Sequence, residues 1–179
     1  VFSLHPRKNF HVLGDGGLIV TNNTALYKKL KILRNHGLVR RDETIIWGTN
    51  SRLDNLQAAF GNIMLKKIKS INKRQIDISK IYDSKLKNIV GLPIYNKKIS
   101  NPTFHQYIIK TKKRNKLKKY LKKKGIDTAI HYPLPIHLQK AYKSSFGKVK
   151  LANTEKYKNM ILSLPISPYL KNSQINYVA

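Results

Sequence analysis

The order of the local signals predicts an α/β fold in which helices cover a sheet. The segment "GGLIVT" (16–21) is rich in β-branched residues after a tight turn, which is typical of a strand. A long helical pattern runs from about Leu53 to Asn88. Beyond it, strand-like and helix-like segments alternate to the end of the chain, which favours an α/β sandwich.

The first helix is predicted within "NNTALYKKLKILRNHG" (22–37). Asn23 or Thr24 can cap its start, and Gly37 follows its end. Apolar side chains recur on one face at Leu26, Leu30 and Leu33. The connection that follows is irregular, and we expect Trp47 to be its buried residue.

The long helix is predicted from apolar residues spaced by three and four positions, with lysines and arginines on the other face. The apolar series consists of Leu53, Leu56, Ala59, Phe60, Ile63, Met64 and Ile68. Gly91, Pro93 and Pro102 break the pattern afterwards.

The second half of the chain contains shorter elements. We expect a strand over 104–111, a basic helix with Leu117, Tyr120 and Leu121 inward that stops at Gly125, and a strand over 126–135 that runs into a proline turn. A short helix over 153–165 is predicted with Asn153 as its cap. The last residues are interpreted as the first turns of a helix capped by Ser173.

Composition places the chain among globular proteins. It has 179 residues, of which 41% are hydrophobic. The sequence has no cysteine, which excludes disulfides and thiolate metal sites, and no apolar run approaches the ~18 residues of a membrane span. We therefore expect a cytoplasmic protein with no membrane partner. Because the chain opens on Val1 inside an apolar segment and closes inside a helix, we interpret it as a fragment truncated at both ends.

The charge balance is strongly basic, with 36 Lys and Arg against 8 Asp and Glu, for a net charge of +28. Such an excess raises the possibility of a nucleic-acid partner. However, the cations are almost all lysines scattered along the chain, and the sequence contains no zinc-finger spacing or RNP aromatic motif. A basic nucleic-acid-binding module is therefore kept as an alternative and is not favoured.

Lys8 is the lysine with the most unusual surroundings, since it lies behind Pro6-Arg7 and between His5 and His11. A neutral lysine amine can form a Schiff base with a carbonyl, and nearby cations or burial would lower its pKa. On local sequence alone, an ordinary surface lysine is the competing interpretation.

Two further segments carry polar groups next to structural breaks. Asn50, Ser51 and Arg52 directly precede the long helix, whose N-terminus favours a phosphate, although capping by Ser51 or Asp54 explains part of the pattern. In "AIHYPLPIH" (129–137), two histidines flank a Pro-x-Pro turn. A metal site is not expected there, because no third ligand lies close by. Substrate contact and a packed turn both stay open.

Read together, these segments resemble the DegT/DnrJ/StrS sugar aminotransferases. "FSLHPRKNFHVLGDGGLIVT" (2–21) is similar to the lysine segment of that family. "RNHG" (34–37), "GTNSRLDNLQAA" (48–59), "GIDTAIHYPLPIHLQKAY" (125–142) and "LSLPISPYL" (162–170) follow in the family's order. The resemblance covers essentially the whole chain.

The resemblance implies a fold of the aspartate-aminotransferase-like type (fold type I) and pyridoxal 5'-phosphate as cofactor. Residues 1–52 would end the large cofactor-binding domain, 53–90 would form the long connecting helix, and 91–179 would form most of a small C-terminal α/β domain. The family's upstream half would supply the ring-stacking aromatic, the aspartate for the pyridine nitrogen and a phosphate loop. The chain alone is therefore expected to be inactive.

The resemblance also implies roles for single residues. Lys8 would carry the cofactor as an internal aldimine and then act as general acid and base, and Ser3 would hold the cofactor phosphate. Asn50 and Arg52 are both candidates to contact the cofactor phosphate in the partner subunit of a homodimer, and the resemblance does not decide which of them does. His5 would line the site. His131 and Tyr132 would lie near the nucleotide-sugar substrate.

The reaction that these roles imply is a transfer of an amino group, most simply from glutamate, to a nucleotide-linked keto sugar in amino-sugar or surface-polysaccharide biosynthesis. The segment "NSRLD" (50–54) resembles the corresponding segment of members that act at C3 of the sugar more than that of members that act at C4. A lysine rather than a histidine at position 8 favours transamination over dehydration. A non-catalytic family relative is the other alternative.

Overall fold

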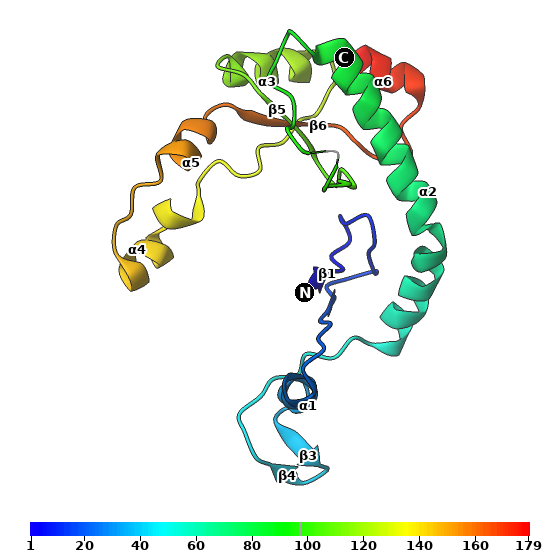
Figure 1. Cartoon of the computed structure of the whole chain (residues 1–179), viewed down its shortest axis with the longest axis vertical. Coiled ribbons are helices and arrows are strands. Elements are labelled where there is room, and N and C mark those ends of the chain that lie inside the picture. Colours follow the sequence, from blue (N-terminus) through cyan, green and yellow to red (C-terminus); the bar gives the residue numbers. More distant parts are fainter. Residues whose placement is uncertain (97) are drawn as a thin grey trace. The chain divides into compact units, whose positions relative to one another are not determined.

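A computed structural model describes residues 1–96 and 98–179, which form two compact units, Val1–Lys69 and Ser70–Ala179. The helix α2 (Asn55–Leu86) belongs to both units, because the boundary falls within it (Figure 1). Its 32 residues agree with the long helix expected from the apolar spacing.

The first unit consists of short strands, one helix and the beginning of α2. The strands β1 (Phe2–Ser3) and β2 (Gly17–Leu18) pair antiparallel, so only part of the predicted strand over 16–21 is regular. They are followed by α1 (Thr24–Leu33) and by a second antiparallel pair, β3 (Leu38–Arg40) with β4 (Glu43–Thr44).

The ends of α1 are set by local chemistry. The side-chain oxygen of Asn23 accepts a hydrogen bond from the Leu26 N–H at 3.0 Å, which confirms one of the two expected caps. At the other end, His36 and Gly37 both have positive φ angles. A Cβ on Gly37 would lie 1.6 Å from the carbonyl oxygen of Ile46, so only glycine fits this turn.

The second unit contains the rest of α2 and a larger set of elements. These are β5 (Tyr107–Lys110), α3 (Arg114–Lys123), the 3₁₀ helix η1 (Ile136–Leu138), α4 (Lys140–Phe146), α5 (Ala152–Tyr157), β6 (Ile161–Leu164) and α6 (Asn172–Val178). β5 and β6 pair antiparallel with Tyr107 opposite Leu164, and α3 packs on β6. The described strands thus pair two by two rather than in the single sheet expected from their order.

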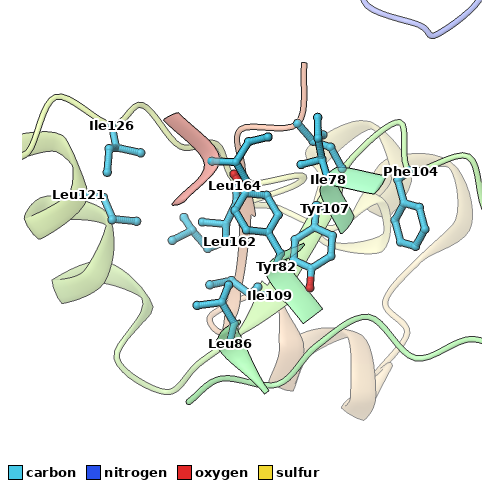
Figure 2. Close-up of a cluster of buried hydrophobic side chains, with 12 residues drawn as sticks. Ile78, Tyr82, Leu86, Phe104, Tyr107, Ile109, Leu121, Ile126, Leu162 and Leu164 are labelled. Carbon is cyan, nitrogen blue, oxygen red and sulfur yellow. The ribbon is translucent and has the colours of Figure 1, made fainter. Parts of the chain in front are cut away.

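The main hydrophobic core lies in the second unit, between α2 and the β5–β6 pair (Figure 2). Ile78 and Tyr82 of α2 are fully buried there. The hydroxyl of Tyr82 donates to the carbonyl oxygen of Pro165 at 2.7 Å, and that of Tyr107 donates to Asp83 at 2.6 Å. Burial raises the pKa of Tyr82 to about 12. It also raises the pKa of Tyr107, together with the Asp83 hydrogen bond. These bonds let the two aromatic rings enter the core with their polar ends satisfied.

The prediction of a helix over 153–165 is wrong for the second half of that range. α5 ends at Tyr157, and Ile161–Leu164 form a strand instead. Pairing with β5 and burial of Leu162 and Leu164 on one face decide this conformation, which local periodicity does not reveal.

Four smaller expectations are also wrong. Asn153 lies inside α5, whose N-cap is Leu151, and Lys171 rather than Ser173 precedes α6 as its cap. Trp47 was expected to be buried but is 96% exposed, because the residues of the first unit leave its ring uncovered. Tyr120 also points outward rather than into the core.

Within the described residues, none of the helices combines the length and the apolar character that crossing a bilayer requires.

Candidate active site

Lys8 lies in a closed loop, residues 4–16, which we call the lysine loop. Next to the β1–β2 pair, the Leu4 N–H donates to the Gly16 carbonyl oxygen at 2.8 Å. The Val12 N–H then donates to the Leu4 carbonyl oxygen at 3.0 Å, and the side chains of Leu4 and Val12 are buried. The loop is therefore held at its base by main-chain bonds and by its own small apolar centre.

The tip of the lysine loop is a tight turn. The Lys8 N–H donates to the His5 carbonyl oxygen at 2.9 Å, with Pro6 and Arg7 at the central positions. The His11 ring lies with Nδ1 3.0 Å from the Lys8 carbonyl oxygen, where an Nδ1–H would donate. The Lys8 N–H is thus bonded to main chain and its carbonyl oxygen to the His11 side chain, which fixes its backbone, and Lys8 is half-buried.

Ser3 and His5 are tied to the same turn. The His5 N–H faces the Ser3 hydroxyl oxygen at 3.4 Å, and the Arg7 N–H donates to His5 Nδ1 at 3.2 Å. Ser3 and His5 are both exposed. The hydrogen bonds of this turn therefore connect three predicted site residues, Ser3, His5 and Lys8.

The first turns of α2 support the lysine loop. The Leu13 N–H donates to the side-chain oxygen of Gln57 at 2.7 Å, and the His11 ring packs against Phe60 with centroids 5.9 Å apart. Gly61 is buried, and a Cβ there would contact Val12 at 3.4 Å. Helix and loop thus pack closely, so the position of Lys8 follows from that of the helix.

Asn50 and Arg52 form a second cluster in the first unit, together with Asn35. The Arg52 guanidinium donates through Nε to Asn50 Oδ1 at 3.0 Å and through Nη1 to Asn35 Oδ1 at 3.2 Å. The backbones of Asn35 and Asn50 also form a bridge. Two carboxamide oxygens therefore orient an exposed guanidinium, whose remaining N–H groups suit an oxyanion.

A groove of about 1550 Å³ lies beside this cluster. Its walls come from the segment after β2, from α1, and from residues 47–53, and they include Leu18, Val20, Tyr27, Trp47, Ser51 and Arg52. The groove is mostly apolar with Arg52 at its wall. It belongs wholly to the first unit.

His131 and Tyr132 lie in the second unit. His131 Nδ1 is 2.8 Å from the Ser163 hydroxyl, and the two rings of His131 and Tyr132 meet edge to face. The backbone of Ser163 exchanges two hydrogen bonds with Ala129, at 2.8 and 3.2 Å. β6 thus holds both the segment and the imidazole, while the Tyr132 ring is exposed.

His137, the other histidine of this segment, is buried and contacts a carboxylate of the same unit. Its Nε2 lies 3.3 Å from Glu155 Oε1. The pKa of Glu155 is held below its usual value, first by the Leu151 N–H and then by His137. Among the residues that the structure describes, no cluster of His, Asp and Glu has the makeup of a metal site.

Sequence reasoning did not single out three residues that position others: Asn35, Gln57 and Ser163. Each lies inside a segment that carried the family resemblance, namely "RNHG", "LDNLQAA" and "LSLP". The signal was therefore present in the motifs, but the role of each residue became visible only from its hydrogen-bond partner.

Comparisons with known proteins agree with the motif order. The family model described as "DegT/DnrJ/EryC1/StrS aminotransferase family" matches residues 1–179. The chain therefore belongs to this family.

Among curated relatives, dTDP-3-amino-3,4,6-trideoxy-alpha-D-glucose transaminase of Streptomyces venezuelae is 38% identical over 97% of this chain and 46% of its own length. The dTDP-3-amino-3,6-dideoxy-alpha-D-galactopyranose transaminase of Aneurinibacillus thermoaerophilus is 37% identical over 99% of this chain and 48% of its own length. Among solved structures, that of S. venezuelae DesV in complex with a ketimine intermediate is 36% identical. It has a TM-score of 0.92 over 99% of this chain and 48% of that chain.

The chain thus has the fold of about half of a sugar aminotransferase, and it spans about half the length of the curated relatives that it matches.

Proposed function

We propose that the full-length protein is a pyridoxal-phosphate-dependent aminotransferase that transfers an amino group from glutamate to a nucleotide-linked keto sugar, in amino-sugar or surface-polysaccharide biosynthesis. The observation that carries this proposal is the lysine loop. It presents a half-buried Lys8 on a backbone that is fixed from His5 on one side and His11 on the other. A lysine that was ordinary surface charge would need no such support.

The donor set of this chain fits the cofactor. The Lys8 amine suits a covalent bond to an aldehyde, and the hydroxyl of Ser3 in the same segment suits a phosphate oxygen. The Arg52 guanidinium, oriented by two carboxamides, suits a phosphate as well. When bound, pyridoxal phosphate supplies the electron sink that stabilises a carbanion at the amino-bearing carbon.

Lys8 would have two tasks. Its Nζ first attaches the cofactor and, once released by the amino donor, takes a proton from one carbon and returns it to another. Both tasks need Nζ to return to one position. The main-chain bond from Lys8 to His5 and the His11 contact fix the backbone from which Nζ extends.

The sugar substrate is assigned to His131 and Tyr132, and His5 is assigned to the lining of the site around Lys8. The imidazole held by Ser163 offers one hydrogen-bonding atom, and the exposed Tyr132 ring offers an apolar face with a hydroxyl. A 3-keto sugar is favoured over a 4-keto sugar by the "NSRLD" segment. Two similar relatives whose names specify 3-amino sugars also support it.

A homodimer with shared active sites completes the proposal. Asn50 and Arg52 would serve the cofactor phosphate of the partner subunit, and Asn35 and Asn50 would hold the guanidinium in place. A cytoplasmic location belongs to the same proposal.

The test is an absorbance spectrum of the full-length protein with pyridoxal phosphate, recorded before and after glutamate. We expect a band of lysine-bound cofactor that bleaches with glutamate and is restored by a 3-keto nucleotide sugar more efficiently than by a 4-keto one. A well-folded protein with no such band would refute the proposal and would favour the non-catalytic alternative.

A further inference from the structure

The proposed reaction makes no use of the strongest concentration of charge in the molecule, the segment around α3. Residues 112–124 include eight lysines and Arg114 but no acidic residue. The next acidic residue after this segment is Asp127. Arg114 is buried and donates to the carbonyl oxygen of Ile161. The exposed lysines, which we call the lysine face, are Lys112, Lys113, Lys116, Lys119, Lys122, Lys123 and Lys124.

The lysine face is directed away from the core by the packing of α3. Leu121 is buried and Leu117 half-buried against the second unit's core, which fixes the rotation of the helix. Lys116, Lys119 and Lys123 are spaced by three and four residues, so they lie along one side over about 10 Å. This side is opposite to buried Leu121, and Lys112 precedes it in the turn before the helix.

This arrangement is electrostatically unfavourable in isolation. Lysines three and four residues apart repel one another, and the segment contains no carboxylate to compensate them. The repulsion is relieved when an anionic surface approaches. A second copy of the chain is excluded as that surface, because its own charge is +28.

We propose that the lysine face binds an anionic lipid surface as a peripheral, electrostatic contact. Nucleic acid is less well matched, because the one arginine of the helix is buried and the exposed Tyr120 ring is already covered by the Lys124 ammonium at 5.8 Å. Long lysine stems on one side of a helix can meet mobile lipid headgroups without a fixed register. The apolar side of α3 is used in the core, so no insertion is required.

The affinity of such a contact is modest and salt-dependent. Each lysine near an anionic membrane contributes about fivefold in binding, so four of them contribute on the order of a few hundredfold. Binding should fall steeply as salt screens the charges. This proposal departs from the sequence-based expectation of no membrane partner. That expectation depended on the lack of an apolar span, which a peripheral contact does not need.

The experiment is sedimentation of the full-length protein with vesicles of phosphatidylcholine, with and without a third of phosphatidylglycerol, at low and high salt. The test variant replaces Lys112, Lys116, Lys119 and Lys123 with Gln. The control replaces Lys140, Lys143, Lys148 and Lys150, exposed lysines of the same unit, so both variants lose the same charge. A third variant replaces the test set with Arg.

We expect binding only to anionic vesicles, a loss on the order of a few hundredfold in the test variant, and retention in the control and in the Arg variant. Thermal melting and aminotransfer to a soluble substrate should be unchanged in all three. Equal loss in test and control variants would assign binding to overall charge and overturn the proposal. So would salt-sensitive binding of a labelled single-stranded or duplex oligonucleotide in the absence of vesicle binding.

Discussion

The two units of the chain differ in how much apolar core they contain and in how many candidate cofactor residues they carry. In Val1–Lys69, the buried apolar side chains are Leu4, Val12 and Met64, while Leu18, Val20 and Trp47 are exposed. In Ser70–Ala179, a continuous core joins α2, β5, α3, β6 and α6. The candidate residues for the cofactor nevertheless all belong to the first unit, where they are held by hydrogen bonds rather than by burial.

The difference indicates two kinds of precision. The second unit holds its form by apolar packing, which is strong but not directional. The first unit positions Lys8 and Arg52 by directional bonds to backbone and carboxamide groups. Substitutions of the hydrogen-bonded site residues should therefore impair function, whereas substitutions in the apolar core of the second unit should impair stability.

The largest functional effect is expected at Lys8. Replacing Lys8 with Ala or Arg in the full-length protein should abolish the lysine-bound cofactor band and lower the rate by about 10³-fold or more, because both the attachment point and the proton carrier are lost. Absorbance and single-turnover kinetics measure this. Lys29→Ala on exposed α1 is the control. An unchanged spectrum in the Lys8 variants would contradict the assignment.

The largest stability effect is expected in the second unit. Leu162→Ala removes a fully buried side chain of β6 and should lower the free energy of unfolding by about 2–5 kcal/mol. Leu56→Ala, at an exposed position of the first unit, should change it by less than about 0.5 kcal/mol. Chemical denaturation compares the two. Similar losses would mean that the first unit also depends on packing at this position.

Asn35 tests whether hydrogen bonds determine the first unit's function. Asn35→Ala should weaken cofactor binding about five- to tenfold, because the Arg52 guanidinium loses one of its two acceptors. Asn35→Asp should also weaken it, since a carboxylate would hold the guanidinium but neutralise its charge. Titration of the apoprotein with pyridoxal phosphate measures both. Asn22→Ala is the matched exposed control, and additivity with Arg52→Ala would refute the positioning role.

Ser163 provides the corresponding test in the second unit. Ser163→Ala should raise the KM for the nucleotide sugar about fivefold and leave the glutamate half-reaction unchanged, because the His131 ring loses its partner. Nitrogen chemical shifts of His131 provide a readout apart from activity. Ser167→Ala, at an exposed position on the same segment, should move neither quantity.

A further prediction concerns the pH dependence of the second unit's stability at high pH. A tyrosine whose pKa is raised in the fold binds its proton more tightly there than in the unfolded chain. Tyr82, with a pKa near 12 against 10 in model compounds, therefore gives stability that is complete below pH 10 and declines toward pH 12. Urea unfolding between pH 8 and 12 measures the decline. Tyr82→Phe should lessen the decline without abolishing it, because the pKa of Tyr107 is also raised. An unaltered profile would contradict this account.

Much of the fold could be predicted from local signals. The apolar spacing predicted α2, Asn23 predicted the start of α1, and Gly37 and Gly125 mark the ends of helices where positive φ angles are found. The ordered motifs identified the family, and the family model confirms it over residues 1–179. Each of these depends on residues near one another in the sequence, where propensity and periodicity act directly.

Other features depend on contacts between residues far apart in the sequence, and only the tertiary structure decided them. Ile161–Leu164 became a strand because β5 lies beside it, and the exposure of Trp47 became visible only in the folded chain. Asn35 and Arg52 are 17 residues apart, and Ser163 and His131 are 32 apart. The sequence by itself determined which residue types could perform the chemistry. The folded chain determined which side chains hold them, because a hydrogen bond depends on distance and direction in space rather than on separation along the chain.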